Sequence, residues 1–227
     1  MEKKIAVIGT GRSGTNFFAA VLSELGKDVL HEKFGEKGIA SWCLVPDCDK
    51  AVYGPGGNMI SPEFIVGHQL RDPLKTIGSL TTFNKASWKF ITSNTHHALP
   101  RKIMHRAMMH WLDWNVRAGE KAEFTWWLED LKTQPPAILD ALGWGVSNVL
   151  WDEAYTRARH GQNTGSDRSS NSMFNSKVGP ITQWRRYKHT HRTTPVSWEE
   201  LRKIDSALAD DILQFSTSMN PPYSLES

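Results

Sequence analysis

Short apolar runs alternate with amphipathic stretches along the chain, and this alternation predicts the order of its elements. Apolar runs of strand length occupy residues 4–9, 28–32, 64–70 and 122–128. Between them, apolar residues recur at helical spacing over 14–26 and 97–118. Strands that alternate with helices predict a parallel sheet with right-handed crossovers. We therefore expect an α/β protein with a three-layer, P-loop-like fold, in which helices flank a central parallel sheet of about four to five strands, as a single domain over residues 1–227.

Cap and turn signals predict where further elements begin and end. Gly26 is placed to end the first helix, and Asp72 followed by Pro73 matches the N-cap and first position of another. We also expect a short helix over 39–44, a helix over 129–142, a helix that starts after Ser197 and ends near Phe215, and a long polar loop over 160–176.

The first strand runs directly into a loop rich in Gly, Ser and Thr. Backbone N–H groups of such a loop converge at the positive end of a helix dipole, which favours an anion. Gly9 and Gly14 have the spacing of a nucleotide P-loop, but Thr15 stands where that motif has Lys, and Asn16 where it has the Mg²⁺-binding Ser or Thr. The loop therefore predicts an anion site that is not built for Mg-ATP chemistry, with an ordinary ligand-free first turn as the alternative.

A second candidate anion site begins where the third strand ends. Arg71 follows that strand, and Ser79 lies about two turns into the next helix. An arginine fork and a hydroxyl can both grip one phosphate through charge-assisted bonds. Taken singly, a structural ion pair of Arg71 and a packing role of Ser79 are the simpler interpretations. Because the carboxyl ends of parallel strands share one edge, this site, the loop over 9–16 and the pair His31 and Glu32 are expected to converge there.

Charge and cysteine content narrow the expected partners. The net charge is +3, but eight of the Lys and Arg residues lie between 157 and 192 with a single Asp, so the positive charge is local. We therefore expect an anionic small molecule as ligand, and neither nucleic acid nor a membrane as partner. Cys43 and Cys48 are the only cysteines and fit free thiols, and no apolar run is long enough for a membrane span, which together predict a cytoplasmic protein.

Two of these motifs together resemble those of one enzyme family. The segment 12–17 resembles the 5′-phosphosulfate loop of sulfotransferases that use 3′-phosphoadenosine 5′-phosphosulfate (PAPS), and Arg71-Asp72-Pro73 with Ser79 resembles their 3′-phosphate motif. Weaker likenesses follow at 127–131 and at 176–179 with Trp184. On these motifs the chain is identified as a short, bacterial- or phage-like member of the PAPS-dependent sulfotransferases, over about residues 4–215.

The resemblance implies a donor, a product and a set of contacts. The donor would be PAPS, the product 3′,5′-adenosine bisphosphate, and no metal is required. The implied donor-binding residues are Arg12, Ser13, Gly14, Thr15, Asn16, Phe17, Arg71, Ser79, Lys177 and Gly179. The chain departs from the family where Leu128 replaces a common aromatic and Lys177 replaces a late Arg, and Phe17 fits a core position as well as an adenine contact.

The chemistry of sulfuryl transfer assigns further roles. Charge builds on the bridging oxygen that leaves, and Arg12 with the loop N–H groups is suited to stabilise it. A base must take the proton of the hydroxyl or amine acceptor, a small molecule or a glycan-like compound. The candidates are Glu32, which we prefer, His31 and His68, although His68 also fits a hydrogen-bonded core histidine.

Two other classes of protein share parts of this pattern. A P-loop kinase of a small molecule would need Mg²⁺ ligands, which Thr15 and Asn16 do not match. A non-catalytic nucleotide- or nucleic-acid-binding protein would use the basic and aromatic run 184–189. The histidines at 96, 97, 105 and 110 match no metal-binding spacing, so we expect no metal.

Overall fold

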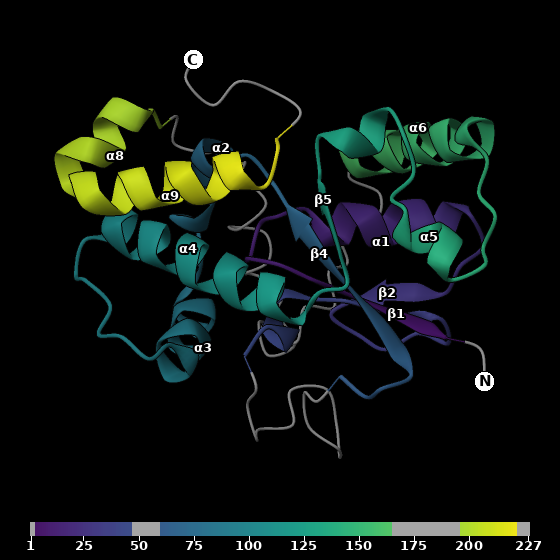
Figure 1. Ribbon diagram of the computed structural model, residues 1–227, viewed down its shortest axis with the longest axis horizontal. Helices are drawn as coiled ribbons and strands as arrows, with labels where there is room; N and C mark the ends of the chain where they lie inside the picture. Colours follow the sequence, from purple (N-terminus) through teal and green to yellow (C-terminus); the bar gives the residue numbers. More distant parts are fainter. Residues whose placement is uncertain (1–2, 47–59, 165–195, 222–227) are drawn as a thin grey trace.

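A five-stranded sheet with every strand parallel forms the centre of the protein (Figure 1). The computed structural model describes residues 3–46, 60–164 and 196–221. The strand order is β2-β3-β1-β4-β5, and the strands are β1 (Lys4–Ile8), β2 (Val29–His31), β3 (Gly38–Ala40), β4 (Phe64–Leu70) and β5 (Phe124–Trp127). The predicted α/β fold with a parallel sheet flanked by helices is confirmed.

The register places the carboxyl ends of the strands at one edge. In β1, Val7 pairs with Ala40 of β3 and Ile8 with His68 of β4, while Ala40 also pairs with His31 of β2. The segments that follow β1, β2 and β4 therefore leave the sheet on the same side, as expected for a parallel sheet.

Helices cover both faces of the sheet (Figure 1). One face carries α1 (Thr15–Glu24), α5 (Ile138–Ala141) and α6 (Asn148–Thr164), and the other carries α2 (Pro73–Leu80), α3 (Lys85–Asn94), α4 (Ile103–Lys121), α8 (Trp198–Ile204) and α9 (Ser206–Ser218). Alternate residues of β1 divide between the two layers: Ile5 and Val7 pack toward α1, whereas Ala6 and Ile8 pack toward α4. This alternation produces two separate cores.

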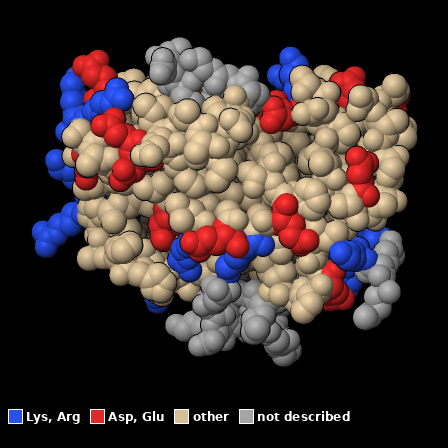
Figure 2. Space-filling model, in the orientation of Figure 1, with Lys and Arg blue, Asp and Glu red and all other residues tan. Residues whose placement is uncertain are grey.

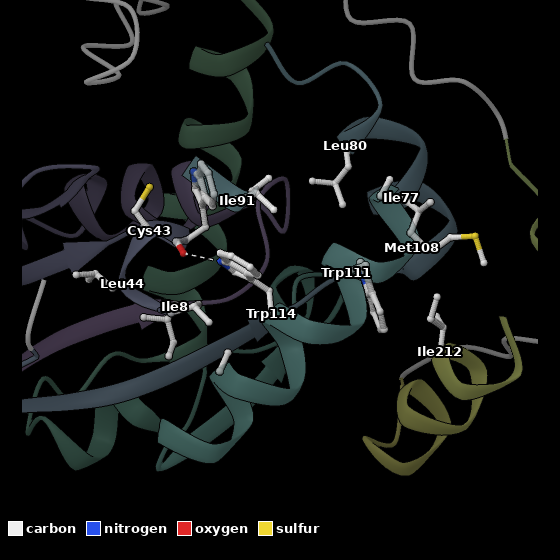
Figure 3. Close-up of a cluster of buried hydrophobic side chains, with 14 of the residues drawn as sticks. Ile8, Cys43, Leu44, Ile77, Leu80, Ile91, Met108, Trp111, Trp114 and Ile212 are labelled. Atoms are coloured by element: carbon white, nitrogen blue, oxygen red, sulfur yellow. Dashed lines mark hydrogen bonds between the residues drawn. The ribbon is translucent and has the colours of Figure 1, made fainter. Parts of the chain in front are cut away.

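The core on the α4 side is rich in tryptophan (Figure 3). Trp111 and Trp114 are completely buried between β4, α2 and α9. The Trp114 indole N–H donates to the carbonyl oxygen of Trp42 over 3.1 Å, the dashed line in Figure 3. Trp42 begins a short 3-10 turn, Trp42–Leu44, so this bond attaches the segment after β3 to α4.

Local signals predicted several boundaries correctly. Asp72 accepts from the Lys75 N–H with Pro73 in the first turn of α2, and Ser197 forms a capping box with Glu200 at the start of α8. Gly26 follows α1 with φ +70°, as expected of a residue that ends a helix. The helix predicted to reach Phe215 is two helices, because Asp205 takes an extended conformation and caps α9.

Other predicted elements were wrong. The segment 39–44 contains the end of strand β3 and the 3-10 turn Trp42–Leu44 instead of one short helix. The helix expected over 129–142 is a 3-10 turn (Asp130–Lys132) and the short α5, because Pro135 and Pro136 lack the N–H that a continuous helix needs. The loop expected from 160 is helical to Thr164, where α6 ends, and the remainder of that loop lies outside the described residues.

Sequence reasoning also missed α3 and the whole of α6, and it placed the start of α4 too early. Residues 97–102 precede α4, and Pro100 restricts Leu99 to an extended conformation. None of the helices in the described part of the chain combines the length and hydropathy that crossing a bilayer requires.

Candidate functional site

The loop between β1 and α1 is packed so tightly that two of its positions require glycine. A Cβ on Gly9 would lie 2.5 Å from the Gln69 carbonyl oxygen, and Gly14 has φ +93° with Leu128 only 2.8 Å from its would-be Cβ. The Gln69 side chain also donates to the Ser13 carbonyl oxygen over 2.8 Å. The P-loop spacing of the two glycines therefore reflects close contact with β4 and with the residue that follows β5.

The first turn of α1 leaves hydrogen-bond donors available to a ligand. Gly14 is the N-cap and provides no side-chain cap, and the first turn holds no acidic residue. The N–H groups of Thr15, Asn16 and Phe17 precede the first helical bond, which Phe18 makes to Gly14. Such N–H groups and the helix dipole together attract an anion.

Buried polar atoms around the loop support the same interpretation. Ser13 is completely buried, and its hydroxyl has no hydrogen-bond partner in the described part of the chain. The same holds for the Thr10 hydroxyl and for Nε of Arg12. Because an unpaired buried donor is costly, the loop fits a ligand that brings acceptor oxygens.

Arg12 is held in an unusual conformation beside this loop. Its φ is +70°, a value that a residue with a side chain rarely adopts. The guanidinium carbon lies 4.9 Å from the ring centre of Phe83, and Nη2 donates to the Thr82 hydroxyl over 3.3 Å. Strained residues fixed by their surroundings are frequent at ligand-binding sites. Thr82 and Phe83 were missed at the sequence level, although they follow Ser79 by only three and four residues.

Arg71 brings the second motif into contact with the first. Its Nη1 donates to the Arg12 carbonyl oxygen over 2.9 Å. Ser79, buried on α2, is joined to the same place because its carbonyl oxygen accepts from the Thr82 hydroxyl at 2.7 Å. The two arginines and the loop therefore lie together, as the parallel-sheet argument predicted, and Thr82 links the backbone of Ser79 to the Arg12 guanidinium.

The charge of this site is unbalanced. Neither Arg12 nor Arg71 makes an ion pair with another residue that the structure describes. Burial lowers the pKa of Arg12, the nearby charge of Arg71 lowers it further, and Glu32 raises it. Arg12 and Arg71 lie close enough for their charges to interact, and only one carboxylate, that of Glu32, offsets the charge of Arg12, so the site favours an anionic ligand.

Glu32 lies at the same edge, two strands away from the loop because β3 separates β2 from β1. Like Arg12 it has a positive φ, +53°, and its N–H donates to the Ala40 carbonyl oxygen. Oε1 accepts from the Trp42 indole N–H at 3.0 Å, whereas Oε2 is buried without a partner among the described residues. His31 is half-buried beside it, and burial lowers the pKa of His31 while Glu32 raises it.

His68 occupies a different environment from the other two candidate bases. It is completely buried, and its Nε2 lies 3.0 Å from Oδ1 of Asn115 on α4. Burial lowers the pKa of His68 to about 4, so the ring is neutral at pH 7. This arrangement is that of a hydrogen-bonded core histidine, one of the two interpretations of this residue.

The remaining site predictions fall in several places. Phe17 is half-buried and packs edge-on against Tyr155 of α6, with 5.0 Å between ring centres. Glu129, from the weakly matching segment, accepts from the Asp72 N–H at 3.4 Å, and burial is the main cause that raises its pKa. Lys177 and Gly179 lie outside the described residues.

The histidines of the central segment do not converge on a metal-binding geometry. His96 and His97 are exposed, and His105 pairs with Asp205 at 3.1 Å. His110 is buried against the Trp114 ring, with 4.4 Å between ring centres. Over residues 3–46, 60–164 and 196–221, no three His, Cys, Asp or Glu side chains come together in a metal-binding arrangement.

Buried neutral histidines predict a loss of stability in acid. Burial lowers the pKa of His110 to about 3, against an ordinary value of 6.5, with Arg117 adding to the shift. Below pH 6.5 the unfolded chain therefore binds a proton that the folded protein does not, so the free energy of unfolding decreases as pH falls. We expect His110 to account for about 2 kcal/mol between pH 7 and pH 5.

Urea unfolding of the wild type and of His110→Phe at both pH values measures this contribution. The phenyl ring retains the aromatic packing and cannot titrate, so the variant should lose about 2 kcal/mol less than the wild type on acidification. An equal loss in both proteins would show that His110 is protonated in the folded state.

Comparisons with protein-family models, with curated proteins and with solved structures find no match for this chain. Function is accordingly inferred from the residues of the site. That site consists of a helix start without a side-chain cap, two guanidiniums, one carboxylate, and buried donors that have no partner among the described residues.

Proposed function

We propose that the protein is a sulfotransferase that moves a sulfuryl group from PAPS to a hydroxyl or amine acceptor. The observation that carries this proposal is the contact between the two resembling motifs, in which Arg71 donates to the Arg12 carbonyl oxygen at 2.9 Å. A donor with a 5′-phosphosulfate and a 3′-phosphate presents two anionic groups. The two guanidiniums, only partly offset by Glu32, match that charge.

Each residue of the site has a role in this proposal. When bound, PAPS supplies the sulfuryl group and a bisphosphate leaving group. The α1 N–H groups and the Ser13 hydroxyl bind its 5′ end, while Arg71 and Ser79 bind its 3′-phosphate. Arg12 stabilises the negative charge that develops during transfer. Its contacts with Phe83 and Thr82 fix the position of the guanidinium in advance.

Glu32 is the proposed base, and the acceptor is a small molecule or a glycan-like compound. The carboxylate lies close enough to Arg12 to raise the pKa of that residue, which supports a base near the transferred group. Two cysteines in the whole chain are too few for a disulfide scaffold, which fits a reducing compartment, and on that basis we propose that the protein is cytoplasmic.

Charged side chains of both signs are interspersed on the face drawn in Figure 2. The described Lys and Arg residues in that view form no continuous basic surface of the kind that binds a nucleic acid backbone. A small anion held in the loop is therefore favoured over a nucleic acid along this face.

Ligand binding tests the proposal against its alternatives. We expect 3′,5′-adenosine bisphosphate to bind in calorimetry and to stabilise the protein by about 2.7 kcal/mol at 100 times its dissociation constant. ATP with Mg²⁺ should bind much more weakly, and a short oligonucleotide should not bind. Tighter binding of ATP with Mg²⁺ would instead favour a kinase, and tighter binding of the oligonucleotide a nucleic-acid-binding protein. Transfer of labelled sulfate from PAPS to a panel of hydroxyl and amine acceptors then tests the reaction itself.

A further inference from the structure

The carboxylate of Glu32 is bound from one side by a buried tryptophan. Trp42 follows β3, the neighbour of β2, and only 5% of its surface is exposed. Its indole Nε1–H donates to Oε1 of Glu32 over 3.0 Å. Oε2 of the same carboxylate is buried and has no hydrogen-bond partner in the part of the chain that the structure describes. The two oxygens are therefore in different environments, and Oε2 lacks the partner that Oε1 has.

The position of Trp42 is fixed by its packing. Its ring lies 5.5 Å from Phe83, 5.3 Å from Phe90 and 6.1 Å from His110, measured between ring centres. Its carbonyl oxygen also accepts from the Trp114 indole N–H. A side chain packed on several sides moves only if its neighbours repack, so the direction of the indole N–H is set by the core.

The same cluster supports Arg12. The Phe83 ring packs against Trp42. The guanidinium carbon of Arg12 also lies 4.9 Å from the centre of the Phe83 ring. Glu32 and Arg12 both have positive φ values, +53° and +70°, and such conformations persist where surrounding contacts determine them. The aromatic cluster therefore holds the candidate base and the candidate charge-stabilising residue in a defined relation.

We propose that Trp42 is a positioning residue, whose indole N–H holds Oε1 of Glu32 so that Oε2 receives the proton of the acceptor. This inference rests on the proposed function. As the proton moves to Oε2, the acceptor O–H or N–H bond breaks. The electron pair left on the acceptor atom forms the bond to sulfur, while the bond from sulfur to the phosphate oxygen breaks. Arg12 and His31 are the titratable groups that interact with this carboxylate.

Trp42→Phe tests the role, because phenylalanine retains an aromatic ring and lacks the indole donor. We expect kcat to fall about 10-fold or more and the KM for PAPS to stay unchanged. Trp88→Phe is the matched control, since it makes the same substitution in the same core but removes an indole N–H that has no hydrogen-bond partner among the described residues. It should keep the wild-type kcat. Identical behaviour of the two variants would overturn the proposal.

A spectroscopic measurement provides a second test that needs neither catalysis nor the Trp42 variant in folded form. In the wild type, the Trp42 indole ¹H–¹⁵N signal should shift as the Glu32 carboxylate titrates, and in Glu32→Gln that shift should disappear. An indole signal that titrates equally in both proteins would overturn the contact. Failure of the proposed function would look different, because the wild type itself would then neither bind 3′,5′-adenosine bisphosphate nor transfer sulfate.

Discussion

Replacing Arg71 with alanine is expected to weaken binding of 3′,5′-adenosine bisphosphate about 100-fold, the effect of removing a charge-assisted contact worth about 3 kcal/mol. Adenosine 5′-phosphosulfate, which lacks the 3′-phosphate, should lose little affinity. Arg71 is half-buried at the end of β4 and makes no ion pair with another described residue, so its charge is available to the ligand. Calorimetry with both ligands measures the difference.

The contact of Arg71 with the Arg12 carbonyl oxygen makes a control necessary, because losing it could disturb the loop. Lys75→Ala is suitable, since Lys75 is exposed in the first turn of α2, where it pairs with Asp72 and interacts with the charge of Glu129. It removes the same positive charge, and both ligands should bind as before. If Arg71→Ala weakened both ligands equally, Arg71 would be a loop-supporting residue and the 3′-phosphate would have to be bound elsewhere.

The edge of the sheet at which the site lies was predictable from the sequence, because polar and charged residues directly follow the apolar runs of the strands. A parallel sheet brings the ends of β1, β2 and β4 together whatever their separation along the chain. The Asp72 cap and the capping box at Ser197 were equally readable, because each depends on residues within one turn.

What could not be predicted depends on contacts between distant residues. Strand β3 is three residues long, and its Gly38 approaches the backbone of Ile5 so closely that no Cβ would fit there. No periodicity can reveal so short a strand. The hydrogen bond between Trp42 and Glu32 depends on the position of β3. Arg12 stacks on Phe83, which is distant in the sequence, so no local pattern indicates this contact. Sequence analysis therefore named Arg12 and Glu32, but not the aromatic cluster that holds them.

Replacing Glu32 with glutamine is expected to slow sulfuryl transfer about 100-fold or more, the usual scale for the loss of a general base. Glutamine retains a side-chain oxygen that can accept from the Trp42 indole N–H, so the residue should stay in place. It cannot take a proton at the position of Oε2, which is the unpartnered oxygen in the described structure. Affinity for 3′,5′-adenosine bisphosphate should remain close to that of the wild type, because Arg71, Ser79 and the loop are untouched.

Rates measured at saturating PAPS for Glu32→Gln, His31→Ala and His68→Ala assign the base. His68→Ala should lower the free energy of unfolding because it leaves Asn115 unpaired in the core, yet the folded fraction should transfer sulfate. His31 is half-buried next to Glu32, so His31→Ala should retain most of the activity. An active Glu32→Gln with an inactive His31→Ala would assign the base to His31. If all three variants remained active on the true acceptor, no side chain would serve as the base, and the acceptor would react already deprotonated or lose its proton to water.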